Sequence, residues 1–183
     1  MPNTILTTRR LRLRSWLMSD VAAYHQHCNT EPVMQFLGGV MPRSQLRAEV
    51  RWFQQHDQQY GHTFWVAERK RDRALLGFCG LIRIPDRGSV LEGELEIGWR
   101  IRADMWRRGY GFEAAAAVLG WAARDVDDRY VWSRIDQGNT ASQALARKLG
   151  MRRDRKVERA MLEAGEGCYV FSKRSGAFRT SSV

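Results

Sequence analysis

The segment MWRRGYGFEA, residues 105–114, constrains the fold of this chain more than any other. It places Gly109 and Gly111 between an alternating pattern that predicts a strand and an alanine-rich pattern that predicts a helix. A helix N-terminus carries unpaired N–H groups and about half a positive charge, so it attracts anions. Glycine lets phosphate oxygens approach the backbone, and Arg107 and Arg108 add formal charge. The segment is therefore typical of a binding loop for a diphosphate.

Two other interpretations of this segment stay open on the residues alone. A plain turn between a strand and a helix also uses glycine, because glycine tolerates positive φ. Residues 109–114 (GYGFEA) also satisfy the dinucleotide fingerprint G-x-G-x-x-[GA]. That fingerprint belongs on the first strand of repeated βαβ units, whereas about 100 residues precede it here. The dinucleotide-binding fold is therefore disfavoured, while the plain turn and the diphosphate loop both stay open on the residues alone.

The patterns along the rest of the chain predict a mixed α/β fold. Alternation predicts strands at residues 10–14, 63–68, 75–84, 90–101, 130–135, 151–160 and 167–173. Helical periodicity predicts helices at about residues 19–28, 31–37, 45–60, 109–126 and 139–150. The last helix has Asn139 at its start and Gly150 just past its end, which is the usual order of caps. We expect a single domain over residues 1–183, with a flexible tail at 175–183.

Composition and charge limit the classes of function. The net charge is +10 and the pI about 10.2, which favours an anionic ligand, nucleic acid or an acidic surface. The three cysteines form no C-x-x-C pair and no ligand pattern with the four histidines, so we expect neither a disulfide framework nor a metal site. Arginines occupy residues 9–14, where a signal peptide needs apolar residues, and the apolar run at 114–123 is too short to span a bilayer. We expect a cytoplasmic protein that does not enter the membrane.

The strand, loop and later helix together resemble a known family. Residues 96–114 (EIGWRIRADMWRRGYGFEA), followed by residues 139–151 (NTASQALARKLGM), resemble the GNAT acetyltransferases. More narrowly they resemble the RimJ/RimL-like branch, which acetylates protein N-terminal amines or small amines. Further similar segments are residues 7–16, 29–39 and 65–81. The resemblance implies the GNAT fold, with a central, mostly antiparallel twisted sheet of about seven strands flanked by helices.

The resemblance also implies acetyl-CoA as the acetyl donor. Its diphosphate would lie on the backbone N–H groups of the loop, which comprises Arg107, Arg108, Gly109, Tyr110, Gly111 and Phe112. Its pantetheine arm would pair like an added strand with Trp99 and Ile101, and Asn139 would contact the arm.

One position departs from the family pattern. Many relatives carry a tyrosine seven residues after the asparagine, where it protonates the leaving thiolate, but this chain has Ala146 there. Ser142 matches a position that the branch uses for this purpose, so Ser142 is the candidate acid. An ordinary polar residue in the first turn of a helix is the alternative interpretation of Ser142.

The strand before the loop supplies a candidate base. By the period of two, Glu92, Glu94, Glu96 and Gly98 share one face of the predicted strand at residues 90–101. If that face lines the acceptor cleft, Glu96 removes the amine proton through a water molecule, and Gly98 leaves room for the acetyl group. A solvated face that balances nearby arginines is the alternative.

The chemistry of amines favours one class of acceptor. An α-amine with a pKa near 8 is about one-tenth neutral at pH 7, whereas a lysine is neutral in under about one part in a thousand. We therefore predict an N-acetyltransferase that acts on a protein or peptide N-terminal α-amine. The alternatives are a small-molecule amine acetyltransferase, a non-catalytic CoA-binding protein of this fold, and a basic protein associated with nucleic acid. Proximity to the ribosome or RNA, and homodimer formation, agree with this prediction.

Overall fold

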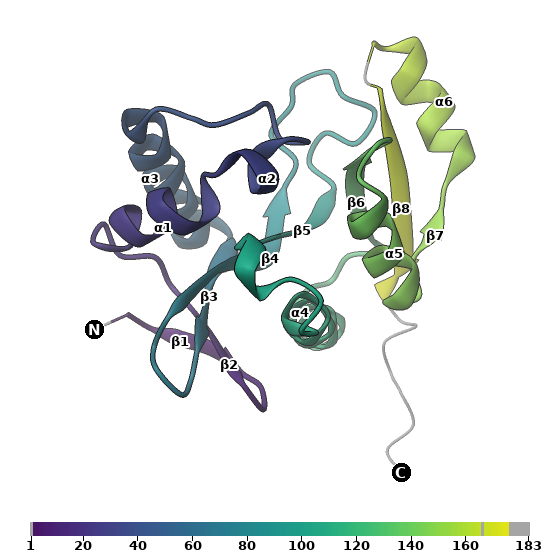
Figure 1. The fold of residues 1–183 in the computed structure, drawn as a ribbon. Helices are drawn as coiled ribbons and strands as arrows, with labels where there is room; N and C mark the ends of the chain where they lie inside the picture. The colour runs from purple at the N-terminus through teal and green to yellow at the C-terminus, as the bar shows by residue number, and fades with distance from the viewer. Residues whose placement is uncertain (1, 166, 176–183) are drawn as a thin grey trace. The chain divides into compact units, whose positions relative to one another are not determined.

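The computed structural model describes residues 2–165 and 167–175 (Figure 1). The chain divides into two compact units, the first comprising Met1–Leu81 with Gly98–Ala117 and the second Ile82–Ile97 with Val118–Val183. That the whole chain is a single domain stays a prediction. The predicted flexible tail lies, from residue 176 onward, outside the described residues.

The first unit is built on antiparallel strands. They are β1 (Thr4–Thr7), β2 (Leu11–Arg14), β3 (Phe64–Arg69), most of β4 (Leu75–Arg83) and the end of β5 (Leu95–Ile101). The strands are hydrogen-bonded in the order β1-β2-β3-β4-β5. Trp65 pairs with Cys79 across β3 and β4, and the N–H of Arg102 donates to the carbonyl of Leu76 at the end of β5. This unit therefore carries β5 directly into the glycine loop.

Helices cover this part of the sheet with an aromatic core. They are α1 (Asp20–Cys28), α2 (Glu31–Met34) and α3 (Arg43–Tyr60), and α1 packs beside α3 (Figure 1). Helix α3 ends at Gly61, whose φ of 73° is the left-handed conformation that favours glycine. The buried side chains of Trp16, Tyr24, Phe53 and Phe78 meet in one cluster.

The second unit contains the other strands and two more helices. Strands β6 (Tyr130–Asp136), β7 (Arg152–Arg153) and β8 (Cys168–Arg174) continue the order β5-β6-β8-β7. β5 and β6 are parallel, with Glu96 opposite Trp132, while the pairs β6–β8 and β7–β8 are antiparallel. Helix α5 (Thr140–Lys148) packs on β6, and helix α6 (Arg155–Glu163) packs on β8.

Helix α4 (Tyr110–Asp125) and strand β5 each begin in one unit and end in the other. A 3-10 turn, η1 (Ala103–Met105), leads from β5 towards α4. The arrangement confirms the predicted class, a mixed α/β fold with a mostly antiparallel sheet flanked by helices.

Two predictions of local structure were wrong. Residues 155–163 form a helix rather than part of a strand, and Asp154 caps it by accepting a hydrogen bond from the N–H of Val157. Helix α2 stops at Met34 rather than at residue 37. The described residues form eight strands, in line with the predicted sheet of about seven, and β1 is the strand that the alternation did not predict. On α4 the buried side chains are Tyr110, Ala114, Ala115, Val118, Leu119 and Ala122.

Within residues 2–165 and 167–175, none of the helices combines the length and the apolar character that a membrane crossing requires.

Candidate active site

The glycine loop connects η1 to the start of α4, within the first unit. Arg107 and Gly109 both adopt left-handed backbone conformations, with φ of 55° and 80°. The first hydrogen bond of the helix runs from the N–H of Glu113 to the carbonyl of Gly109, at 3.0 Å. As in every helix, the amides of the first turn, here Tyr110 and Gly111, have no acceptor inside the helix. The loop therefore has the backbone form that binds anions at a helix N-terminus.

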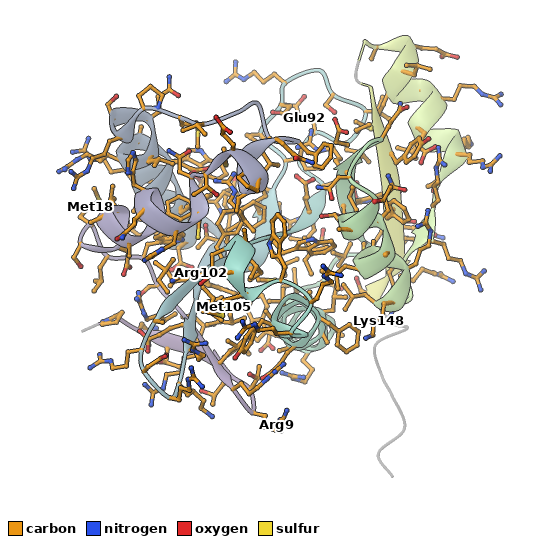
Figure 2. The ribbon with its side chains drawn as sticks, in the orientation of Figure 1. Arg9, Met18, Glu92, Arg102, Met105 and Lys148 are labelled. Atoms are coloured by element: carbon orange, nitrogen blue, oxygen red, sulfur yellow. The ribbon has the colours of Figure 1, made fainter. Side chains whose placement is uncertain are left out.

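The segment before the loop is tied to the end of β5. Trp106 is 46% exposed, yet its indole N–H donates to the carbonyl of Ile101 at 2.6 Å. Arg102 precedes η1 and Met105 is its last residue (Figure 2); Arg102 pairs with Asp104, and the Met105 sulfur accepts an N–H from Arg69. These contacts fix the point at which the chain leaves the sheet and enters the loop.

A cluster that the sequence prediction missed lies against the loop. The Glu113 carboxylate accepts the Thr8 hydroxyl at 2.6 Å, the Arg10 backbone N–H at 2.7 Å and the Arg10 Nε–H at 2.6 Å. Arg10 also donates from Nη1 to the carbonyl of Arg108 at 3.0 Å, and its guanidinium lies 4.3 Å from the ring centre of Tyr110. Burial alone would raise the pKa of Glu113, but the hydrogen bonds from Thr8 and Arg10 outweigh it, so this pKa lies below its ordinary value.

The end of β5 carries the two predicted arm-binding residues. Ile101 is buried and Trp99 is half-buried, both on the extended backbone that precedes the loop. The expectation that Gly98 leaves room for an acetyl group was wrong, because a Cβ on Gly98 would lie 2.5 Å from the Phe64 ring. Phe64 stacks in turn on Phe78, with ring centres 5.0 Å apart. The space above Gly98 is therefore filled by an aromatic ring.

Arg100, on the same strand, is a half-buried cation. It donates from Nη1 to the Tyr24 hydroxyl, and its Nη2 lies 3.5 Å from a carboxylate oxygen of Glu49. Its Nε has no hydrogen-bond partner among the described residues. The guanidinium also lies over the Phe78 ring, 4.9 Å from its centre, and a cation in that position is stabilised by the ring.

Glu96, the candidate base, lies in the second unit and is held by one arginine. Glu96 is only 8% exposed. Its carboxylate accepts three hydrogen bonds from Arg134: from the backbone N–H at 3.1 Å, from Nε–H at 3.2 Å and from Nη2–H at 3.0 Å. Burial lowers the pKa of Arg134, but Glu96 and Asp86 raise it further than burial lowers it, so the guanidinium stays charged. This pair fixes the orientation of the Glu96 carboxylate. A proton transferred to Glu96 would have to bind a carboxylate oxygen that already accepts a hydrogen bond from Arg134.

The predicted row of carboxylates does not form. β5 begins at Leu95, so Glu92 and Glu94 lie in the preceding turn and not on a strand face. Glu92 accepts the N–H of Gly88 at 2.8 Å, and Glu94 accepts the indole N–H of Trp132 at 2.8 Å. Both carboxylates therefore support local structure, and Glu96 alone of the three is on the strand.

Asn139 and Ser142 lie at the start of α5, also in the second unit. The Asn139 side chain accepts the N–H of Ser142 at 3.0 Å, which confirms the predicted cap. Gln143 secures the turn before the helix by donating to the carbonyls of Asp136 and Gln137, at 3.3 and 2.9 Å. Ser142 is half-buried, and Ala146, one turn further on, is fully buried.

The structure thus brings the predicted residues together in two groups. Trp99, Ile101 and the loop from Arg107 to Phe112 belong to the first unit, and Glu96, Asn139 and Ser142 belong to the second. Among residues 2–165 and 167–175, no three His, Cys, Asp or Glu side chains gather in a way that could hold a metal ion.

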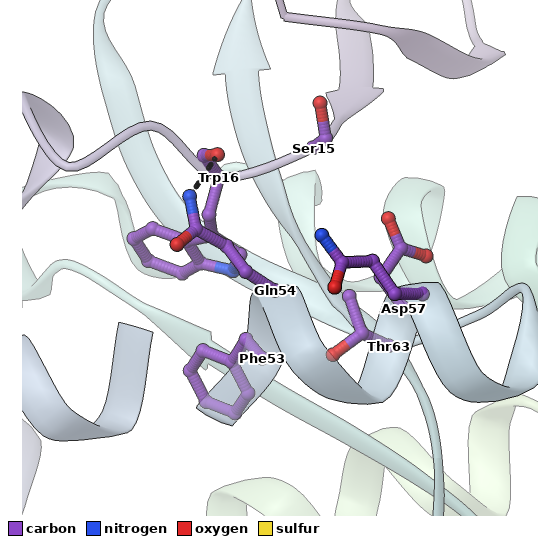
Figure 3. Close-up of a pocket in the computed structure, with 7 residues that line it drawn as sticks. Ser15, Trp16, Phe53, Gln54, Asp57 and Thr63 are labelled. Carbon is purple, nitrogen blue, oxygen red and sulfur yellow. Dashed lines mark hydrogen bonds between the residues drawn. The ribbon is translucent and has the colours of Figure 1, made fainter. Parts of the chain in front are cut away.

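A pocket of about 290 Å³ lies elsewhere in the first unit, and no predicted site residue lines it (Figure 3). Helix α3 supplies Phe53, Gln54 and Asp57, and Trp16 and Thr63 complete much of the wall. Gln54 donates to the carbonyl of Trp16 at 2.9 Å, and Asp57 accepts the indole N–H of Trp65 at 3.3 Å. The Thr63 hydroxyl is buried with no partner among the described residues.

Comparison with known proteins agrees with the fold. The profile of the family described as "Acetyltransferase (GNAT) domain" matches residues 10–152. The chain is 34% identical over 149 residues to the uncharacterized protein YkkB of Bacillus subtilis (strain 168), which covers 81% of this chain and 85% of that protein.

Solved structures share the fold. The crystal structure of an acetyltransferase from Agrobacterium tumefaciens str. C58 superposes with a TM-score of 0.77, at 23% identity over 92% of each chain. RimL, named a ribosomal L7/L12 alpha-N-protein acetyltransferase and solved in complex with coenzyme A, superposes with a TM-score of 0.72, at 17% identity over 94% of this chain and 98% of that chain.

Proposed function

The chain belongs to the GNAT acetyltransferase family, and we propose that it acetylates the N-terminal α-amine of a protein or peptide, in the manner of the RimJ/RimL branch. Acetyltransferases of this family use acetyl-CoA, which supplies the acyl carbon that the amine attacks. The observation that supports the proposal is the loop: two left-handed residues turn the chain into α4, whose first amides have no acceptor inside the helix and follow directly after Arg107 and Arg108.

Each group of predicted residues has a part in this proposal. The amides from Arg107 to Phe112 bind the diphosphate, and the extended backbone at Trp99 and Ile101 pairs with the pantetheine arm. Asn139 contacts the arm from the start of α5. Ser142 donates a proton to the departing sulfur and regains one from solvent water, and Glu96 accepts the proton of the amine through a water molecule. Because a thiol pKa is near 8.5, the thiolate leaves readily and a weak acid such as Ser142 suffices.

The class of acceptor rests on the chemistry of amines and on one structural relative. RimL is named for acetylating an α-amine on a protein. A mildly basic site serves an α-amine, which is about one-tenth neutral at pH 7, but not a lysine. Ribosome proximity, a homodimer and a cytoplasmic location belong to the same proposal, and the charge of +10 supports attraction to RNA. Acetylation of a small-molecule amine is the second candidate.

Calorimetry with acetyl-CoA tests the cofactor part of the proposal. We expect binding in the micromolar range, and the absence of binding at about 1 mM, the upper end of ordinary KM values, would contradict the proposal. Gly109→Glu places a carboxylate in the loop and should abolish binding. Gly88→Glu is the matched control, since Gly88 has the same φ of 80° and lies in the turn between β4 and β5. Equal affinity in the two variants would exclude a role for the loop.

A screen of acceptors tests the substrate part. Release of the CoA thiol is followed with three acceptors: a peptide with a free N-terminus, the same peptide with a blocked N-terminus and a free lysine, and a small alkylamine. We expect turnover only with the first. Turnover confined to the alkylamine would replace the proposed acceptor by the small-molecule alternative.

A further inference from the structure

Arg10, far from the loop in sequence, contacts two loop residues, Arg108 and Tyr110, and the helix residue Glu113 through one guanidinium. We propose that Arg10 is a positioning residue of the diphosphate loop, which fixes the loop backbone and offsets the charge of Glu113 so that a diphosphate can bind. This inference rests on the proposed function of the loop, and it adds a determinant of donor affinity that lies outside the loop itself.

The contacts of Arg10 restrain the backbone of the loop. Arg10 reaches the loop carbonyl of Arg108 through Nη1, the ring of Tyr110 through its face, and the first turn of α4 through the Nε–Glu113 pair. A Cβ on Gly109 would lie 3.3 Å from Nη2 of Arg10. The carbonyl of Arg108 is thus turned towards Arg10. Because a peptide bond is planar and trans, the N–H of Gly109, which shares this peptide, points to the opposite side. Arg10 therefore restrains the orientation of the loop amides.

Arg10 also compensates the negative charge of Glu113. A carboxylate in the first turn of α4 competes with a diphosphate for the positive end of the helix and repels it. Here the Glu113 carboxylate is engaged by the turn between β1 and β2, through Thr8 and Arg10, and its charge is compensated by a guanidinium at 2.6 Å. The helix thereby keeps a structural carboxylate without losing its attraction for an anion. With Arg10 removed, the uncompensated charge would lie at the mouth of the site.

Arg10 also fastens α4 to the β1–β2 turn, so a purely structural role is the alternative to exclude. The two roles differ in what they predict for ligands that lack phosphate. A positioning role in the diphosphate loop affects ligands that carry the diphosphate and spares those that do not. A general loss of structure would weaken both classes of ligand to the same extent.

The experiment therefore measures the dissociation constants of CoA and of S-acetylpantetheine, which has the arm and the thioester but no diphosphate. The variants are Arg10→Gln, Arg10→Lys, Glu113→Gln and the double variant Arg10→Gln/Glu113→Gln. Arg9→Gln is the matched control, because Arg9 is the exposed neighbour of Arg10 and its loss changes the net charge equally (Figure 2). Circular dichroism and thermal melting show which variants are folded.

We expect Arg10→Gln to weaken CoA binding about tenfold or more and to leave S-acetylpantetheine binding within about twofold of wild type. Arg10→Lys keeps the charge, but an ammonium group cannot reach both Glu113 and the Arg108 carbonyl as the guanidinium does through Nε and Nη1, so its CoA affinity should lie between those of wild type and Arg10→Gln. The double variant should bind CoA more tightly than Arg10→Gln, because the repelling charge has gone. If Arg10→Gln is unfolded, Arg10→Lys replaces it: a loss of CoA affinity that exceeds its loss of S-acetylpantetheine affinity supports the inference, and equal losses contradict it.

Two results would overturn the inference: equal losses for both ligands, or CoA affinities in the Arg10 variants that match Arg9→Gln. The failure of the proposed function looks different. In that case wild-type protein itself would bind CoA no more tightly than S-acetylpantetheine, and the role of Arg10 would be refuted together with the diphosphate site.

Discussion

Replacing Glu96 by glutamine separates its structural role from its predicted catalytic role. The change is isosteric, so the new amide oxygen can still accept the Arg134 backbone N–H and Nε–H, which lie 3.1 and 3.2 Å from the present carboxylate oxygen. The other position becomes an NH₂ group, which meets the Nη2 donor of Arg134 where an oxygen now accepts at 3.0 Å. One charge-assisted bond is lost, the backbone N–H bond becomes a neutral one, and the Nε–H bond keeps its charged donor but loses its charged acceptor.

The size of the effect follows from these contacts. A hydrogen bond to a charged group contributes about 1.5–3 kcal/mol and a neutral one about 0.5–1.5 kcal/mol. Because both side chains keep some access to solvent, 21% and 11%, we take the lower part of the range and expect a loss of about 2 kcal/mol. For a chain of this length about 2–4 °C of melting temperature is lost per kcal/mol, so the melting temperature should fall by about 4–8 °C.

The assay combines thermal melting with kcat/KM measured against pH on a free N-terminal peptide. Removal of a general base costs about 10²- to 10⁴-fold in rate and flattens the acidic limb of the pH profile. Glu94→Gln is the matched control: Glu94 is exposed and accepts only the indole N–H of Trp132 among its described contacts, which an amide oxygen can also accept. We expect Glu94→Gln to melt within about 1 °C of wild type.

Each outcome has a separate meaning. Equal melting temperatures for the two variants would refute the reasoning about the Arg134–Glu96 pair. A fall in kcat/KM of less than about threefold, with an unchanged pH profile, would refute the prediction that Glu96 is the base. Melting loss without kinetic loss would make Glu96 a structural residue only.

Three further predictions concern other parts of the chain. Gly77→Ala should unfold the protein or cost more than about 4 kcal/mol in a denaturant melt, because Gly77 has φ 136° and an added Cβ would overlap the backbone carbonyl of Arg100; a near-wild-type melt would contradict this close approach. Burial raises the pKa of the Cys28 thiol to about 12, so a thiol reagent should modify the half-exposed Cys168 in the native protein well before Cys28, and the reverse order would contradict the fold. The folded-state pKa of Glu113 lies below its ordinary 4.5, so its stabilisation is complete above about pH 4.5 and is lost as pH falls further; Glu113→Gln should therefore melt below wild type at about pH 7, the difference should shrink as pH falls below about 4.5, and a constant difference would disprove the linkage.

Local signals in the sequence were enough to predict the frame of the site. The alternation before residue 101, the glycines of the loop and the alanine-rich run after it located β5, the loop and α4. Asn139 was predicted as a cap from its place before a helical pattern, and its side chain accepts the N–H of Ser142. These features depend on neighbours along the chain, which a single sequence displays.

Contacts between distant segments could not be predicted in this way. Arg10 and Glu113 are separated by 103 residues, and Glu96 and Arg134 by 38, so their pairing depends on how the strands are ordered. Period two placed Gly98 on the correct face but could not tell that Phe64 lies above it. For α6, the signal was present in the cap residue Asp154, but the predicted strand at residues 151–160 was continued past it.

Arg107 illustrates a conflict between thermal robustness and ligand affinity. Because Arg107 is not a glycine and has φ 55°, its backbone carries a strain of about 1 kcal/mol. Glycine at this position would remove the strain, although the greater conformational entropy of glycine in the denatured chain offsets part of that gain. Glycine would also delete a positive charge beside the first amides of α4. A directed-evolution campaign that selects only for heat resistance would thus be drawn towards Arg107→Gly, and it would enrich sturdier proteins that attract a polyanionic donor less strongly.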